Sequence, residues 1–97
     1  MTKIQMIIAK DGDVLNFDHV KSVYLRCDNP KDNAISWTYS IIAKTGDNEK
    51  YCLCGGYDYE TARGILIFEM TRARQTNGIA RFDGDIMARL HERGGKA

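Results

Sequence analysis

Three cysteines and two histidines are the residues of this chain whose types could bind a metal or supply a nucleophile. Cys52 and Cys54 are two residues apart, whereas Cys27, His19 and His91 are scattered. Structural zinc sites use two tight ligand pairs such as Cys-x₂-Cys. A cysteine nucleophile needs a base within hydrogen-bond reach and a third group that orients the base. Neither pattern is present, so we expect buried, small apolar cysteines on strands, with no metal, no cofactor and no catalytic residue.

Aspartate residues occur in two nearly identical stretches, Ile7–Asp13 and Ile41–Asp47, which agree at six of seven positions. A divalent cation needs several converging oxygens, and no further acidic pattern supplies them. A glycine beside aspartate is instead a strong hairpin signal, because glycine accepts positive φ. We therefore interpret both stretches as turns. Alternation predicts even-numbered core residues in the first stretch and odd-numbered ones in the second, which argues against an internal repeat.

Arginine is concentrated in the last third of the chain, where six of the seven arginines lie at or after Arg63. Arginine forks suit carboxylates and phosphates, but a net charge of +1 gives little general attraction to nucleic acid. Arginine together with tyrosine has the composition of protein-binding hot spots. The candidate partner-binding residues are therefore Tyr57, Tyr59, Arg72, Arg74, Arg81, Arg89 and Arg93.

The elements that must position these residues are strands first and helices second. Residues 1–56 contain several short alternating segments separated by polar turns, and we expect about five short antiparallel strands. The clearest alternation runs from Ile35 to Ile41, and it predicts that Trp37 and Tyr39 point into the core. Strands followed by helices are typical of the α+β class. We expect a curved sheet or a small open barrel.

One long helix is predicted over residues 57–78. Asp58 is a suitable N-cap and Asn77-Gly78 a suitable stop. An apolar stripe at i, i+3, i+4 spacing should face the sheet. Gly64 lies inside the helix, and we interpret it as allowing a close contact between helix and sheet. Residues 79–97 are predicted to form a short second helix, capped by Asp83, and a frayed tail.

The composition predicts one globular domain spanning residues 1–97. The chain is 43% hydrophobic and 28% charged, which is typical of folded proteins. It contains no apolar run long enough for a membrane span, and its start lacks a signal-peptide core. The odd number of cysteines favours reduced thiols. We therefore expect a cytoplasmic protein.

The stretch "YCLCGGYDYETARGILIFEM" (residues 51–70) and the stretch "IIAKDGDVLNFDHVKSVYL" (residues 7–25) resemble small proteins of Firmicutes and their phages. Those proteins are similar to pleckstrin-homology-like small barrels capped by a C-terminal helix. The resemblance covers about residues 1–76, and the segment 79–97 departs from it. It implies a bacterial or phage setting and a binding scaffold, and it assigns no site residue.

Two functional hypotheses follow. The first is a non-enzymatic protein-binding module. In a phage or mobile element, such a module would be an accessory protein that binds or inhibits a host protein such as a defence complex. The alternative is a nucleic-acid-binding protein that uses the C-terminal arginines, and it predicts a steep loss of affinity as salt rises. Either a monomer or a homodimer is compatible with the pattern.

Overall fold

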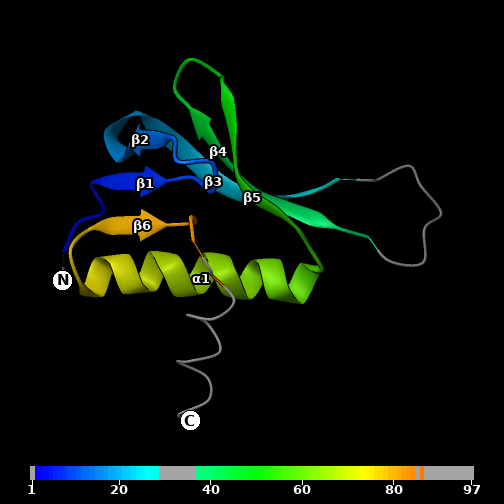
Figure 1. Ribbon diagram of the computed structural model, residues 1–97. Helices are drawn as coiled ribbons and strands as arrows, with labels where there is room; N and C mark the ends of the chain where they lie inside the picture. Colours follow the sequence, from blue (N-terminus) through cyan, green and yellow to red (C-terminus); the bar gives the residue numbers. More distant parts are fainter. Residues whose placement is uncertain (1, 29–36, 85, 87–97) are drawn as a thin grey trace, which may run out of the picture.

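The computed structural model describes residues 2–28, 37–84 and 86, and its elements belong to the α+β class (Figure 1). In chain order the elements are β1 (Met6–Ile8), β2 (Val14–Asn16), the 3₁₀ turn η1 (Phe17–His19), β3 (Val20–Cys27), β4 (Tyr39–Thr45), β5 (Lys50–Tyr57), α1 (Tyr59–Gln75) and β6 (Ile79–Arg81). None of the described helical residues forms a segment both long and apolar enough to cross a bilayer.

The first sheet has the strand order β2-β1-β6. Strands β1 and β2 form an antiparallel hairpin, and β6 returns from the far end of the chain to lie parallel to β1, with Ala80 beside Ile7. This corrects the prediction for residues 79–97, which begin with a strand and not with a helix. A three-residue strand is too short to show alternation, and its partner is distant in sequence. The predicted second helix, apart from Ile86, lies outside the described residues.

The second sheet has the order β3-β4-β5 and is antiparallel throughout. A backbone hydrogen bond joins it to the first hairpin, because Lys10 N donates to Leu53 O at 2.8 Å. The described part of the chain thus forms six strands in two sheets that do not close into a barrel. The α+β class is confirmed, whereas a single curved sheet of five strands is not.

A bulge in β5 changes which of its residues face the core. Ile41 pairs with Cys54 and the next residue, Ile42, pairs with Cys52, so Leu53 is the extra residue. Leu53 and Cys54 are both buried, and Cys52 is exposed. The prediction that the cysteines are buried is therefore right for Cys54 and wrong for Cys52, because a bulge breaks the period of two.

The first similar stretch buries the opposite set of residues from the one expected. Ile7 and Ala9 are buried, and so are Ile41 and Ala43 in the second stretch. Both stretches therefore bury odd-numbered residues at matching positions, and the argument from opposite parity was wrong. The even-numbered Met6, expected in the core, is only partly buried.

Both stretches nevertheless form hairpin turns, as predicted. In Ala9–Asp13 and in Thr45–Glu49 the end residues are hydrogen-bonded across a three-residue loop, and the third loop residue has positive φ. That residue is Gly12 (φ 95°) in the first turn and Asn48 (φ 66°) in the second. The two turns have the same form, and they lie 36 residues apart in the sequence. The two similar stretches are offset by 34 residues, so their shared Gly-Asp pair falls at a different position within each turn.

Helix α1 begins and ends where the sequence predicts. The Asp58 carboxylate accepts a hydrogen bond from Thr61 N at 2.8 Å, which satisfies a free N–H group of the first turn. At the other end Gly78 has φ 79°, and its N–H donates to Ala73 O at 2.9 Å. The positive φ needs glycine, which ends the helix.

The stripe of α1 that faces the sheets contains one charged residue. Its buried members are Ala62, Ile65, Glu69 and Ala73. Sequence periodicity identified the three apolar members and missed Glu69, because a glutamate interrupts an apolar pattern. A Cβ added at Gly64 would meet no atom within 4 Å, so no close helix–sheet contact requires that glycine.

The core lies between α1 and the two sheets (Figure 1). Its largest fully buried apolar side chains come from β1, β4, β5, α1 and the segment after β6, and include Ile7, Ile41, Leu53, Ile65 and Phe82. Burying each such side chain stabilises the fold by about 1.5–3 kcal/mol. Because Phe82 is among them, the segment that directly follows β6 belongs to the core. The predicted frayed tail lies outside the described residues.

Candidate functional site

Three tyrosines come together where β5 joins α1. Tyr57 is paired with Tyr39 across the strands, and the ring of Tyr59 meets that of Tyr39 edge-on, with centroids 5.3 Å apart. Tyr59 remains 47% exposed and Tyr57 is partly buried. The structure therefore brings the two predicted tyrosines together at one end of the helix. Trp37, which alternation assigned to the core, is 48% exposed, because residue 37 precedes the first paired residue of β4.

The predicted arginines do not form one surface among the described residues. Arg72 turns inward, where its guanidinium lies 2.8 Å from the buried Glu69 carboxylate. Arg81 forms a two-pronged pair with Asp83, at 3.1 Å and 2.9 Å, and this contact helps to raise the Arg81 pKa. Both cations thus have carboxylate partners within their own chain. Arg89 and Arg93 lie outside the described residues.

Arg74 differs from these two because its side chain is exposed and makes no ion pair with a described residue. It shares the outer face of α1 with Tyr59, Arg63 and Ile67. These three residues follow one another at intervals of four. Ile67 is a large apolar side chain that is 49% exposed, whereas Ile65 on the opposite face of the same helix is buried. We call Tyr59, Arg63, Ile67 and Arg74 the outer stripe. Ile67 is not among the candidates from the sequence, although its position opposite the buried stripe is a signal that could identify it.

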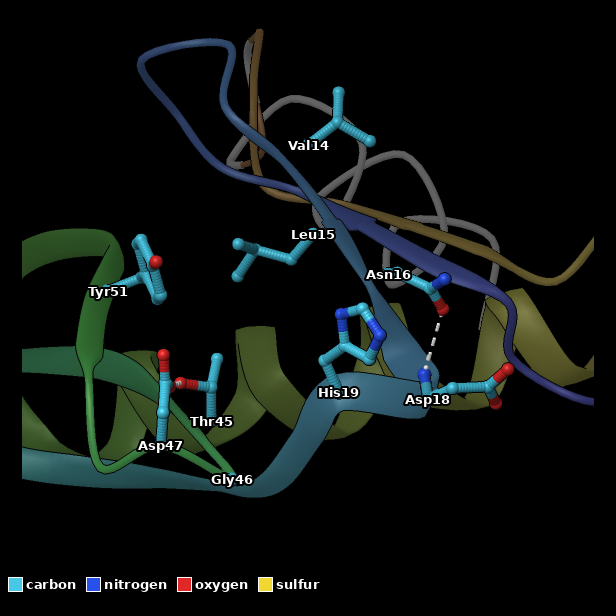
Figure 2. Close-up of a pocket in the computed structure, with 9 residues that line it drawn as sticks. All are labelled: Val14, Leu15, Asn16, Asp18, His19, Thr45, Gly46, Asp47 and Tyr51. Carbon is cyan, nitrogen blue, oxygen red and sulfur yellow. Dashed lines mark hydrogen bonds between the residues drawn. The ribbon is translucent and has the colours of Figure 1, made fainter.

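A second feature is a cleft of about 640 Å³ between the first hairpin and the turn that joins β4 to β5 (Figure 2). We call it the seam cleft, because it lies where the two sheets meet without forming a continuous ladder. Leu15 and His19 approach it from one side, and Asp47 and Tyr51 approach it from the other. Its lining residues are Val14, Leu15, Asn16, Asp18, His19, Thr45, Gly46, Asp47 and Tyr51.

Two of the six polar side chains that line the seam cleft, Asp18 and Asp47, are carboxylates. The Thr45 hydroxyl donates to the Asp47 carboxylate, and this bond, with a smaller contribution from His19, lowers the Asp47 pKa. The Tyr51 hydroxyl donates to Glu49 at 2.6 Å, which raises the Tyr51 pKa. The lowered pKa of Asp47 favours its ionised form at neutral pH. The sequence suggested only turn chemistry for Asp47, because nothing local shows that two distant hairpins meet.

The remaining groups with metal or nucleophile chemistry are spread apart. Among the residues that the structure describes, no three His, Cys, Asp or Glu side chains converge as metal ligands. Burial, with a smaller effect of Cys52, raises the pKa of the Cys54 thiol to about 12. Cys54 is therefore protonated at neutral pH, a state in which a thiol is a poor nucleophile.

We compared the chain with protein-family models, with curated proteins and with solved structures, and found no match. The resemblance to small pleckstrin-homology-like proteins therefore stays a prediction.

Proposed function

We propose that this chain is a protein-binding module that uses the outer stripe of α1 as its contact surface. The observation that carries the proposal is the exposure of Tyr59 and Ile67, 47% and 49%, on the helix face that also carries Arg63 and Arg74. Aromatic and arginine side chains around a central apolar residue are enriched in binding hot spots. Helices that dock into grooves also use anchoring side chains spaced about four residues apart on one face.

The charge of the outer stripe indicates the chemistry of the partner. Arg63 and Arg74 are exposed, and neither forms an ion pair with a described residue. Glu60 is the one acidic residue in the first turn of α1. The stripe is therefore net positive, and its complement is an acidic protein surface with an apolar pocket for Ile67. Charge complementarity of this kind steers association and suppresses wrong partners.

The resemblance to Firmicutes and phage proteins supports a more specific setting. In that setting the chain is a phage or mobile-element accessory protein, it acts in the bacterial cytoplasm, and its partner is a host protein such as a component of a defence complex. A small scaffold of two sheets with one long helix packed on them would present the outer side of that helix as a rigid contact face. This step rests on the resemblance and on the size of the domain.

The experiment compares three proteins as baits in a bacterial lysate: the wild-type chain, Ile67→Asp and Arg63→Glu. The matched control is Lys21→Glu, which reverses an exposed charge on β3. We expect at least one protein to be lost with both stripe variants and kept with the control. That protein is then purified and titrated, and each stripe variant should weaken its binding about tenfold or more.

A captured protein whose purified form binds wild type and stripe variants equally would overturn the proposal, as would a capture that never rises above background. Chromatography with light scattering, in low salt with short DNA and RNA, tests the alternative. A nucleic-acid complex that dissociates as salt rises would replace protein binding with the arginine–phosphate hypothesis. A second copy of the chain as the partner would show as concentration-dependent mass in the same measurement.

A further inference from the structure

We propose that the seam cleft binds an ammonium or guanidinium group carried on an aliphatic stem, such as the side chain of lysine or arginine. This site is separate from the outer stripe. Its residues come from β2, η1, the end of β4, β5 and the turn between β4 and β5, and none comes from α1 (Figure 2). The proposal therefore does not depend on the function proposed for the helix face.

The shape of the cleft suits a side chain with an apolar stem. Val14 is 59% exposed, and Leu15 projects from β2 between the two polar walls, toward the ring of Tyr51 (Figure 2). Aliphatic and aromatic surface of this kind packs against the methylene groups of lysine and arginine. The face of a tyrosine ring also attracts a cation within about 6 Å of its centroid.

The charges at the cleft select a cation over an anion. Asp18 and Asp47 line it, and two more carboxylates, Glu49 and Asp13, are close enough to Tyr51 to raise its pKa. On the positive side Lys3 lies 4.0 Å from Asp18, in a pair whose members are 83% and 72% exposed. A pair this exposed is weak, so an incoming cation can take the place of Lys3 at little cost.

The side chains of the cleft are less suited to binding an anion or a metal ion. His19 is the only imidazole in the lining, and its attraction to Asp47 helps to keep that carboxylate ionised. An ionised Asp47 carboxylate can accept charge-assisted hydrogen bonds from an ammonium or guanidinium group. Among the described residues no three ligating side chains converge, so an organic cation fits the cleft better than a metal ion.

A second hollow extends the cleft along β2 and favours a cation that is part of a peptide. It is lined by residues 3–6 and shares Val14, Asn16 and Asp18 with the cleft. A peptide whose basic side chain enters the cleft therefore has further surface on which to lie. A free amine would use the cleft alone.

The test follows backbone amide shifts of the ¹⁵N-labelled protein as small cations are added. The probes are n-butylguanidinium and a capped pentapeptide with arginine between two pairs of glycines. The control peptide carries citrulline, a neutral residue of the same shape, in place of arginine. We expect both cations to shift the amides of Leu15, Gly46 and Asp47, and the citrulline peptide to bind at least about tenfold more weakly.

The two sources of the cation are distinguished in the same titration. If the peptide binds much more tightly than n-butylguanidinium, the natural occupant is a side chain of a peptide. Equal affinities indicate a free amine or guanidine. Either result supports the cationic site.

Variants connect the binding to the carboxylates. Asp47→Asn keeps an acceptor for the Thr45 hydroxyl and removes the charge, and Asp18→Asn tests the other wall. Each should weaken binding about threefold or more, while Glu60→Gln on α1 should leave it unchanged. The absence of shifts at these amides up to about 10 mM probe would overturn the proposal. The proposal would also be overturned if both asparagine variants bound the probes as tightly as the wild-type protein does. Larger amide shifts with inorganic phosphate than with the cationic probes would overturn it as well.

Discussion

Glu69 and Arg72 form an ion pair inside the protein, with the guanidinium Nη2 2.8 Å from a carboxylate whose side chain is 0% exposed. The same carboxylate oxygen accepts the backbone N–H of Arg81, the last residue of β6, at 3.2 Å. Arg72 in turn donates to Ile79 O at 3.4 Å. The pair therefore joins α1 to the strand that returns from the end of the chain, which explains a charged residue in the buried stripe.

Replacing Arg72 should destabilise the protein strongly. Arg72→Met keeps the aliphatic bulk but removes the cation beside a buried carboxylate, and we expect the free energy of unfolding to fall by about 2–4 kcal/mol. Arg74→Met is the matched control, because Arg74 is exposed, and it should change stability by no more than about 0.5 kcal/mol. Urea unfolding followed by circular dichroism measures both. Equal effects of the two substitutions would mean that the pair is not structural.

The sequence was sufficient for features whose causes are local. The cap at Asp58, the stop at Gly78 and the two hairpin turns each depend on a few adjacent residues, and each is where it was predicted. Such signals survive because capping and positive φ are properties of short segments.

The features that the sequence did not reveal depend on pairing between distant segments. Strand β6 is defined by its parallel contact with β1, and the bulge at Leu53 is defined by its register against β4. Neither leaves a periodic signal in its own residues. The exposure of Cys52 and the structural role of Arg72 follow from these contacts, so both were misjudged.

The same limit applies to the candidate sites. Arginine composition identified the C-terminal third as a contact region, but it could not separate Arg72, which pairs with Glu69, from the exposed Arg74. The sequence does not indicate the seam cleft, because Asp18 and Asp47 line one cleft only where the first hairpin meets the turn between β4 and β5.

Two glycines should respond in opposite directions to alanine. Gly64 lies in the middle of α1 with no atom within 4 Å of an added Cβ, so Gly64→Ala should stabilise the protein by about 0.5–1 kcal/mol through helix propensity. At Gly55 an added Cβ would come within 3.3 Å of Ser40 Cβ and still closer to its hydroxyl oxygen, which bonds Asp28. Gly55→Ala should therefore destabilise by roughly 1–3 kcal/mol.

Thermal or urea unfolding of the two alanine variants provides the measurement, and each serves as the other's control. A destabilising effect at Gly64 would indicate a close packing contact that the structure does not show. A neutral effect at Gly55 would mean that Ser40 can move without loss of its bond to Asp28.

Acid should weaken the helix cap. Hydrogen bonds from Thr61 lower the Asp58 pKa below its ordinary value of 3.8. A carboxyl whose pKa is lower in the folded state stabilises the fold above the unfolded pKa, and this stabilisation is lost as pH falls through the folded pKa. Asp58→Asn keeps a good N-cap acceptor and removes the titration.

The difference in stability between wild type and Asp58→Asn should therefore be constant near neutral pH and shrink below about pH 4. Urea midpoints measured from pH 7 to pH 3 test this expectation. Asp47, whose pKa is also lowered, is present in both proteins, so its contribution largely cancels in the comparison. A difference that widens as pH falls would contradict the assigned role of Asp58.

The bulge in β5 predicts that two cysteines only two residues apart react at very different rates. Cys52 is exposed, whereas Cys54 is 3% exposed and has its pKa raised to about 12 by burial. The thiolate is the reactive form, and at pH 8 a thiol with this pKa is ionised in only about one molecule in ten thousand. Iodoacetamide should therefore modify Cys52 at least about a hundredfold faster than Cys54 in the folded protein.

Peptide mapping by mass spectrometry after timed alkylation resolves the two sites, and Cys52→Ser provides the control in which the fast reaction on β5 disappears. In urea both thiols should react at similar rates, because the bulge and the burial are lost together. Rapid modification of Cys54 in the folded protein would show instead that β5 continues its alternation through Leu53. The side chains at 52 and 54 would then lie on one face, as the sequence alone suggests.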